Sequence, residues 1–265
     1  MAPQPEYSVV IPAYNEEDRL EGPLLETLTY LRDRCEGFEI LVVDDGSRDR
    51  TADVARDLGG DHPEVDLIRL PANRGKGFAV RTGVMNSTGR FVLFADADGS
   101  TPIGDVERLR DRIDVGADVA IGSRELGDGD VEVETRAYRK VMGRIFHGLV
   151  SLLAVGDFED TQCGFKLLRG PVARDLFARI RMDGFSFDIE LLSLALREGY
   201  RVDEVPVNWS HVPGSRVNLL TDSLRMVRDL FIIRSRLARG AYGEPREQRP
   251  PTEDSRQPVA ELPTG

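Results

Sequence analysis

The chain has few cysteines, few histidines and no long apolar run, and each shortage excludes a class of protein. Cys35 and Cys163 cannot build a disulfide framework and lack the spacing of metal ligands. The three histidines are scattered and suggest no zinc site. The longest uncharged stretch, residues 145–156, is shorter than the roughly 20 apolar residues that cross a bilayer. With no signal peptide before the first apolar run, we expect a reduced, cytoplasmic protein that meets a membrane only at its surface.

Lysine is also scarce, so the positive charge is almost entirely arginine. The only lysines are Lys76, Lys140 and Lys166. The net charge of -11 argues against nucleic acid as a partner, because phosphate backbones select basic surfaces. Clustered arginines can still bind a phosphate locally. The 265 residues suffice for one large domain with a full core.

Short apolar runs alternate with segments of helical periodicity, which predicts an α/β fold. We expect a mostly parallel sheet with helices on both faces, and strand ends at Asn15, Asp44 and Asp96 along one rim. Asn15 and Thr101 are expected as helix N-caps, with Pro102 as a first helical residue. Strands are predicted at 7–13, 38–43, 65–70, 91–95, 117–121, 163–168 and 202–209, and helices at 16–34, 50–58, 76–88, 102–113, 136–154, 171–180, 187–197 and 217–239.

Two carboxylates follow the apolar run 91–95 directly. Asp96 and Asp98 are two residues apart, a spacing that places both side chains on the same side of an extended chain. Like charges this close favour a hard divalent cation between them, shared with substrate phosphates. The alternative is that both are ordinary turn and capping residues.

Two common nucleotide-binding motifs are absent. A P-loop needs a glycine five residues before its lysine and a serine or threonine after it, but Lys76 has Pro71 and Gly77 there. The dinucleotide fingerprint needs a glycine-rich turn after the first strand, where this chain has residues 12–16, Pro-Ala-Tyr-Asn-Glu.

Four other motifs resemble the family 2 inverting glycosyltransferases of GT-A fold, in the order and spacing of that family. They are residues 9–16 (VVIPAYNE), 42–47 (VVDDGS), Asn73 with 75–77 (GKG), and 96–99 (DADG). In the C-terminal half, residues 122–124 (GSR) and 160–167 (DTQCGFKL) are similar to the dolichyl-phosphate glucosyltransferases, with mannosyl enzymes as near relatives. The resemblance spans residues 7–239.

The resemblance implies roles for individual residues. Asp96 and Asp98 would hold Mg²⁺ or Mn²⁺ against the diphosphate, and Lys76 would lie near the nucleotide or its phosphates. Asp96, Asp98 and Arg124 would be the catalytic residues. The remaining donor-side residues would be Pro12, Ala13, Tyr14, Glu16, Asp44, Asp45 and Ala97.

Arginines are the expected ligands of the acceptor phosphate. A lipid monophosphate, with a second pKa near ~6, is already largely ionised at neutral pH and needs no protein base. It needs positive charge, and the resemblance places acceptor-binding arginines in the regions of Arg124, Arg136, Arg139 and Arg216. We therefore expect glucose transfer from UDP-glucose to a polyprenyl phosphate at the cytoplasmic face of a membrane. The alternatives are another sugar such as mannose, a soluble acceptor, or a non-catalytic protein that binds nucleotide sugars or membranes.

Two further features have more than one interpretation. Asp188 and Glu190 either complement the dipole of a helix or, for Asp188, bind sugar hydroxyls. Residues 216–240 form an amphipathic, arginine-rich helix that lies on an anionic membrane or packs on its own domain. The expected domains are a glycosyltransferase domain (1–215), this helix, and a disordered tail (241–265). Eukaryotic members of the resembling branch have an N-terminal membrane anchor, which we do not expect here. Cys163 is expected to be a buried residue and not a nucleophile.

Overall fold

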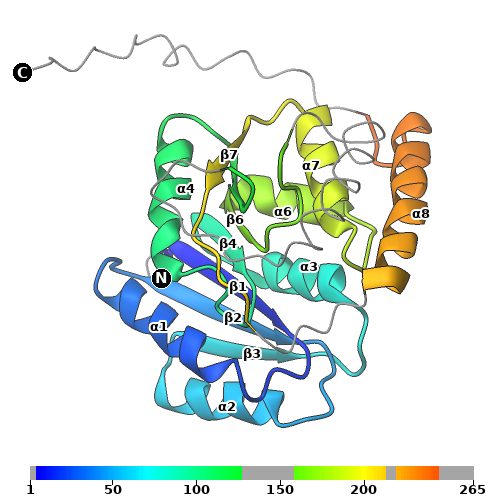
Figure 1. The fold of residues 1–265 in the computed structure, drawn as a ribbon. Helices are drawn as coiled ribbons and strands as arrows, with labels where there is room; N and C mark the ends of the chain where they lie inside the picture. The colour runs from blue at the N-terminus through cyan, green and yellow to red at the C-terminus, as the bar shows by residue number, and fades with distance from the viewer. Residues whose placement is uncertain (1–3, 127–157, 213–218, 245–265) are drawn as a thin grey trace, which may run out of the picture.

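A single sheet forms the centre of the molecule. The computed structural model describes residues 4–126, 158–212 and 219–244, and only the backbone of residues 219–224. The strands are β1 (Tyr7–Ala13), β2 (Phe38–Asp44), β3 (Val65–Arg69), β4 (Phe91–Ala95), β5 (Val119–Ser123), β6 (Phe165–Arg169) and β7 (Val202–Pro206). They lie in the order β3-β2-β1-β4-β6-β5-β7 (Figure 1). Among these described strands only β6 pairs antiparallel with its neighbours, so the predicted mostly parallel sheet is confirmed.

Helices cover both faces of the sheet, because adjacent strand residues point to opposite sides. The helices are α1 (Glu21–Arg32), α2 (Thr51–Asp61), α3 (Lys76–Asn86), α4 (Val106–Asp114), α6 (Gly170–Arg179), α7 (Phe187–Arg197) and α8 (Leu219–Ala238). Val9 and Ile11 of β1 join a core with α1, α2 and α4. Val10, between them, joins a second core with α3, α6, α7 and α8. Apolar side chains therefore fill a core on each face, as expected for a doubly covered sheet.

Two predicted helix starts are wrong, because local turns replace them. Asn15 has a φ of +55° and does not cap a helix; its side-chain oxygen accepts a hydrogen bond from the Arg48 amide (2.9 Å). Helix α1 begins only at Glu21. Pro102 is extended, with ψ 139°, and a short 3-10 turn (Ile103–Asp105) precedes α4. The chain therefore spends more residues in the loops at the sheet rim than the periodicity indicated.

The reversed direction of β6 has a consequence for the rim. Phe165 pairs with Ala95, and Lys166 pairs with both Phe94 and Ile121. The amino end of β6 therefore lies beside the carboxyl ends of its neighbours. Residues 158–164, which precede β6, are thereby brought to the same edge as Asp96.

Helix α8 packs against the sheet domain and the chain continues in order beyond it. Met226, Leu230 and Ile233 are buried, and Tyr242 is only 4% exposed. The burial of Tyr242 corrects the predicted start of the disordered tail at residue 241; residues 245–265 lie outside the described part. The predicted helix 136–154 also lies outside it. In the part of the chain that is described, no helix is long and apolar enough to cross a bilayer.

Candidate active site

The loops that follow β1 and β2 are bound to each other by side-chain hydrogen bonds. The Asn15 amide donates to Ser47 Oγ (2.9 Å), and the Glu16 amide donates to Thr51 Oγ1 (2.7 Å). The Asp45 amide donates to the Ala13 carbonyl (2.9 Å). These bonds hold the predicted nucleoside-side residues Pro12, Ala13, Tyr14, Glu16, Asp44 and Asp45 in one continuous wall. Tyr14 and Pro12 are half-buried there.

Each acidic residue of this wall already has partners within the protein. Asp44 is fully buried, accepts from the Ser47 amide (2.9 Å) and lies 3.3 Å from Arg69 Nε. Glu16 pairs with Arg19 at 2.6 Å. Asp45 accepts from the amides of Arg74 (2.8 Å) and Gly75 (2.7 Å). Burial raises the pKa of Asp45, although the two amide bonds act against the rise. Asp45 thus holds the loop that leads into α3.

The glycines around Lys76 allow close packing against the loop between α6 and α7. A Cβ on Gly75 would lie 2.5 Å from the Asp183 carbonyl oxygen, and one on Gly77 would lie 2.5 Å from that of Met182. The Phe78 amide also donates to the Asp183 carbonyl (3.1 Å). The two glycines of the Gly-Lys-Gly motif are therefore needed because the backbone of residues 182–183 lies so close to them. This close contact fixes the first turn of α3 and the position of Lys76.

Four charged side chains gather where β4, α3, α7 and β6 meet, and we call them the strand-end cluster: Lys76, Asp96, Lys166 and Asp188. Lys76 Nζ lies 2.5 Å from Asp96 Oδ1. Lys166 Nζ donates to Asp188 Oδ1 and to the Cys163 carbonyl, both at 2.6 Å. Lys166 is fully buried and Asp188 is 3% exposed. Two positive and two negative charges balance, as buried ions require.

The electrostatics of the strand-end cluster keep Lys76 charged. Burial lowers the pKa of Lys76, but the charges of Asp96 and Asp188 outweigh it and raise the pKa overall. Burial raises the pKa of Asp188, against the opposing charges of Lys166 and Lys76. Asp188 is therefore part of a buried ion pair. Complementing the dipole of α7 is thus not the only role of its carboxylate.

Asp98 lies in the turn after β4 and faces a different cation. Its Oδ1 accepts from the Ser100 amide (3.1 Å) and from Ser100 Oγ (2.7 Å), and its Oδ2 lies 3.7 Å from Arg19 Nη1. Strand β4 ends at Ala95 and a turn follows at residues 97–98. The extended-chain geometry assumed for the Asp96–Asp98 pair is therefore wrong, although both carboxylates remain at the rim.

The donor chemistry of this rim fits a divalent cation. Asp96 and Asp98 supply hard oxygen ligands, and in this structure each faces a positive side chain. The described residues contain no group of three or more histidines, cysteines or acids arranged around a metal position. Two carboxylates suit an ion such as Mg²⁺, which keeps several waters and takes its other ligands from substrate phosphates.

Arg124 follows β5 and is bound to an acid from the segment before β6. Its Nε and Nη2 donate to the two oxygens of Asp160, at 2.6 and 2.9 Å. Asp160 is buried, and its own amide donates to Glu204 (2.7 Å). Burial would raise the pKa of Asp160, but the charge and hydrogen bonds of Arg124 hold it below its usual range. The indole of Trp209 lies 5.7 Å from the guanidinium. Arg124 is thus held rigidly at the rim.

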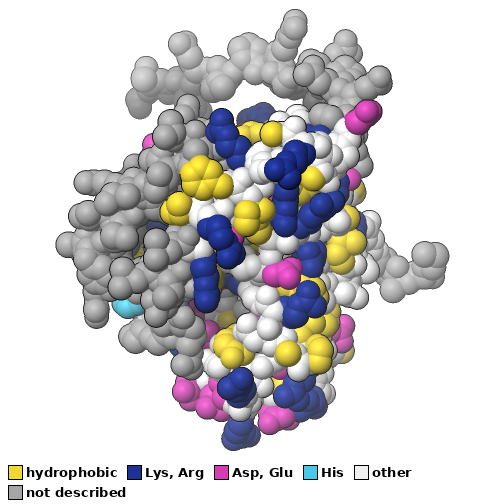
Figure 2. Space-filling view, turned by 90° about the vertical axis from the view of Figure 1, so that its right-hand side faces the viewer, with side chains coloured by type: hydrophobic (Ala, Val, Ile, Leu, Met, Phe, Trp, Pro, Cys, Tyr) yellow, Lys and Arg dark blue, Asp and Glu magenta, His cyan; other side chains and the backbone are white. Residues whose placement is uncertain are grey.

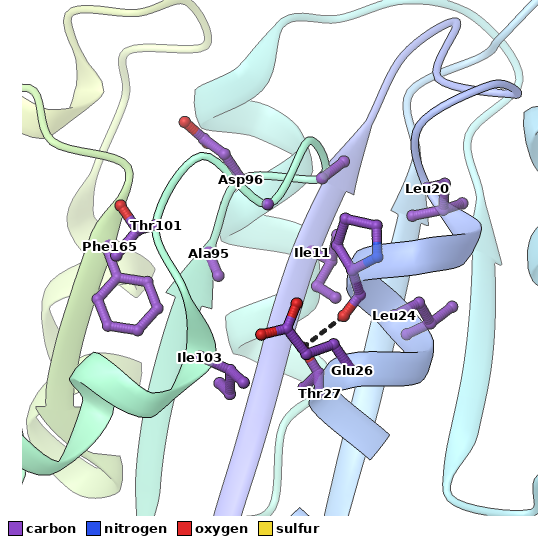
Figure 3. Close-up of a pocket in the computed structure, with 13 residues that line it drawn as sticks. Ile11, Leu20, Leu24, Glu26, Thr27, Ala95, Asp96, Thr101, Ile103 and Phe165 are labelled. Carbon is purple, nitrogen blue, oxygen red and sulfur yellow. Dashed lines mark hydrogen bonds between the residues drawn. The ribbon is translucent and has the colours of Figure 1, made fainter. Parts of the chain in front are cut away.

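A small cavity opens below the 96–101 turn, between this turn and α1 (Figure 3). It is lined mostly by apolar side chains, including Ile11, Leu24 and Phe165, with Asp96 at its edge. Ala97, from the predicted set, also lines it. Lys76, Arg124 and Asp188 do not line this cavity. We therefore interpret it as a gap in the packing between the turn and α1, and not as the substrate site.

The structure thus brings together Lys76, Asp96 and Asp188, and it adds residues without a predicted role. Lys166, Asp160, Arg19 and Gly164 are such additions. A Cβ on Gly164 would lie 2.1 Å from an Asp96 carboxylate oxygen, so only glycine leaves room for that carboxylate. The sequence does contain a signal for Lys166, because it is a charged residue inside the otherwise apolar run 165–168. The predicted acceptor arginines Arg136, Arg139 and Arg216 lie outside the described residues.

Glu190, two residues after Asp188, has no part in the strand-end cluster. Its Oε2 accepts from the amides of Arg181 (2.8 Å) and Met182 (2.7 Å). Its Oε1 accepts from the hydroxyl of Tyr242 and lies 3.5 Å from Arg236 Nη1. Glu190 therefore holds the C-terminal helix to α7. Cys163 is fully buried, and burial raises the pKa of its thiol to about 12, as expected of a residue that is no nucleophile.

The sequence matches known proteins along most of its length. The family model "Glycosyl transferase family 2" matches residues 8–177. A dolichyl-phosphate beta-glucosyltransferase of Drosophila melanogaster is 40% identical over 91% of this chain and 78% of the relative. Proteins of the same name are 38% identical in Homo sapiens, over 91% and 78% of the two chains, and 35% identical in Saccharomyces cerevisiae, over 89% and 76%.

Solved structures share the fold at lower identity. Glucosyl-3-phosphoglycerate synthase from Mycobacterium tuberculosis, in complex with Mn²⁺, UDP-glucose and phosphoglyceric acid, superposes with a TM-score of 0.66 at 21% identity, covering 92% of this chain and 82% of that one. Another complex of that synthase contains Mg²⁺ and UDP and has a TM-score of 0.64 at 21% identity, covering 92% and 81% of the chains. The expected GT-A fold is confirmed by these likenesses together with the family match.

Proposed function

Because this chain belongs to glycosyl transferase family 2, we propose that it transfers glucose from UDP-glucose to a polyprenyl phosphate such as dolichyl phosphate, with inversion and with help from Mg²⁺ or Mn²⁺. The observation that carries the proposal is the 35–40% identity, over about nine-tenths of the chain, to proteins named dolichyl-phosphate beta-glucosyltransferase. The acceptor is a membrane lipid, so we also propose peripheral contact with the cytoplasmic face of a membrane.

In this proposal the donor lies along the wall formed after β1 and β2. Pro12, Ala13, Tyr14, Glu16, Asp44 and Asp45 contact or position the nucleoside, with the ring of Tyr14 supplying apolar contact. Asp96 and Asp98 would hold the divalent cation, which, when bound, stabilises negative charge on the leaving diphosphate. Lys76 supplies a fixed positive charge beside it, since its pKa is raised by Asp96 and Asp188. Asp188 adds negative charge near Lys76 and is the proposed ligand of sugar hydroxyls.

The acceptor needs positive charge and not a base. An oxygen of the lipid phosphate attacks the anomeric carbon from the face opposite the diphosphate, the bond from that carbon to the diphosphate breaks, and its electron pair leaves with UDP. Arg124 is the described acceptor ligand in this proposal, because its guanidinium is fixed by Asp160 and cannot lose its charge at neutral pH. Arg136, Arg139 and Arg216 remain the other proposed ligands.

The test is transfer of radiolabelled glucose from UDP-glucose to prenyl phosphate in detergent, followed by organic extraction. We expect label in the organic phase that depends on Mg²⁺ or Mn²⁺ and disappears with EDTA. Asp98→Ala should reduce transfer at least about a hundredfold, because electrostatic stabilisation of the leaving group is lost. Asp53→Ala, which removes an exposed acid on α2, is the matched control and should leave transfer unchanged.

Three outcomes would contradict parts of the proposal. Label confined to the aqueous phase would indicate a soluble acceptor or hydrolysis. Full turnover by Asp98→Ala would refute the assigned metal ligand. No transfer from any of several nucleotide sugars would favour a non-catalytic binding protein.

A further inference from the structure

One side of α8 is buried and the other combines arginines with an exposed aromatic ring. Leu230 and Ile233 belong to the core, and Met226 is 9% exposed. On the outward side, Arg225, Arg228, Phe231, Arg234 and Arg239 are exposed, and Phe231 retains 57% of its surface. At 3.6 residues per turn, Arg228, Phe231 and Arg239 lie opposite the buried residues, with Arg225 and Arg234 at the two edges of this outward side. We call this outward side of α8 the strip.

The strip is strongly positive on a protein that is strongly negative. Residues 225–239 contain five arginines and one acid, Asp229, whereas the whole chain has a net charge of -11. The Asp229 side chain is 14% exposed; one of its oxygens accepts from Ser186 Oγ (3.0 Å) and the other pairs with Arg228 at 2.9 Å, while the Arg228 side chain itself stays 70% exposed. Figure 2 views the side of the molecule on which α8 lies in Figure 1, and over its upper half basic and apolar side chains are interspersed. Most of the acidic side chains in this view gather near the lower edge.

A groove along the strip adds apolar surface beside the charges. It is shallow and open to solvent, and is lined by Arg228, Phe231, Ile232, Ser235, Arg236 and Arg239. An arginine side chain can place its aliphatic part along such a surface while its guanidinium reaches a phosphate. An aromatic ring among arginines on one helix face is the composition of helices that lie in the interface of an anionic bilayer.

We propose that this strip of α8 is the docking surface of the enzyme for anionic phospholipid headgroups of a bilayer, with Phe231 inserted among them. The occupant follows from charge complementarity, because the basic charge is local to a chain whose total is acidic. The inference deepens the proposed function, since it names the surface by which the enzyme reaches a membrane that contains its acceptor.

The attachment of α8 would fix the orientation of the active site on that membrane. Glu190 of α7 accepts from Tyr242, which follows α8, and Arg236 of α8 lies 3.5 Å from the same carboxylate. Two residues earlier on α7, Asp188 belongs to the strand-end cluster. In Figure 1 the carboxyl ends of β1, β2 and β3 point toward the side on which α8 lies. Docking by α8 therefore presents the rim, and not the far edge of the sheet, to the lipid phase.

The test is sedimentation of the full chain with vesicles, in the absence of sugar donor. Vesicles of phosphatidylcholine alone are compared with vesicles that also contain phosphatidylglycerol. We expect binding to the mixed vesicles that weakens as salt is raised, because charge attraction is screened. Arg228→Gln and Arg239→Gln should each weaken binding roughly fivefold, and Phe231→Ser should weaken it further. The matched controls are Arg56→Gln on α2 and Val115→Ser just after α4, at exposed positions of helices that cover the other face of the sheet from α8, and neither should change binding.

Two readouts separate this proposal from the proposed function and from misfolding. The α8 variants should keep the urea midpoint of the unchanged protein and its transfer to a short, water-soluble prenyl phosphate, while transfer to acceptor embedded in mixed vesicles falls. If no transfer occurs with any acceptor, the vesicle result still decides the docking surface. Equal binding of variants and unchanged protein, or no binding to mixed vesicles, would overturn the proposal. So would a dimer in ultracentrifugation that Phe231→Ser dissociates, because the strip would then be an interface between two copies.

Discussion

Among single residues, Gly164 determines how Asp96 can be placed. It lies just before β6, and the Asp96 amide donates to its carbonyl (3.1 Å). The Asp96 carboxylate occupies the space where a Cβ of residue 164 would be, with both oxygens within 2.5 Å of that point. Backbone contact on one side and Lys76 on the other therefore leave the carboxylate a single position.

Replacing Gly164 with alanine should displace Asp96 and so reduce activity. We expect Gly164→Ala to lower kcat/KM for glucose transfer at least about tenfold, because small displacements of a positioned group cost much of its contribution to catalysis. The measurement is steady-state transfer with saturating metal. Gly60→Ala is the control: nothing lies within 4 Å of its added Cβ, and alanine in α2 should stabilise the fold by about 0.5–1 kcal/mol. Equal activity of the two variants would show that Asp96 tolerates the methyl group.

Partners of single residues were the hardest part of the site to predict. Apolar runs that end in acids indicated Asp44, Asp45 and Asp96 at one rim, and the structure places them there. The Lys166–Asp188 pair joins residues 22 positions apart, and the Arg124–Asp160 pair joins residues 36 apart. Such pairs depend on how β6 is inserted into the sheet, and local pattern contains no information about that insertion.

At the scale of elements, prediction succeeded where burial decides structure and failed where loops do. Helix α7 has the predicted bounds, because nine consecutive residues from Phe187 to Ala195 are buried and fit no other element. Helix α1 starts five residues later than predicted, because residues 15–17 bind the loop after β2 instead. The antiparallel direction of β6 was not predicted, since periodicity does not report strand direction.

The junction between α7 and α8 gives a prediction about the stability of an element. Tyr242 is buried and its hydroxyl donates to Glu190, whose other partners are two backbone amides and Arg236. Tyr242→Phe removes one donor from a buried carboxylate and should lower the free energy of unfolding by about 1–3 kcal/mol. Urea unfolding measures this loss, and hydrogen exchange should rise most in α8.

The control for this variant is a tyrosine whose partner is exposed. Tyr30 donates to Glu107 at 2.6 Å, and the Glu107 side chain is 66% exposed. Tyr30→Phe should change the free energy of unfolding by less than about 0.5 kcal/mol. If both variants lose equal stability, or if exchange in α8 is unchanged in Tyr242→Phe, the hydroxyl does not hold the helix.

For the whole molecule, buried carboxylates with opposite pKa shifts determine how stability depends on pH. Burial raises the pKa of Asp45 and of Asp188, so their ionisation costs stability as pH rises through those raised values. The pKa of Asp160 is lowered: burial acts to raise it, and the charge and hydrogen bonds of Arg124 outweigh burial. Asp160 therefore contributes stability that is complete above its unfolded value near ~3.9 and is lost as pH falls through its folded value.

These opposing shifts predict a maximum of stability on the acidic side of neutrality, followed by a steep loss below about pH 4. Asp160→Asn tests the predicted loss of stability in acid, because it leaves Arg124 without its charged partner. At pH 7 this variant should be less stable than the unchanged protein by about 3–5 kcal/mol, the usual cost of breaking a buried ion pair. Urea unfolding at a series of pH values should show that this difference shrinks as pH falls through the folded pKa of Asp160, since protonation removes the same ion pair from the unchanged protein. A difference that stays constant into strong acid would mean that Asp160 stabilises the rim by packing and neutral hydrogen bonds, and that its charge contributes nothing.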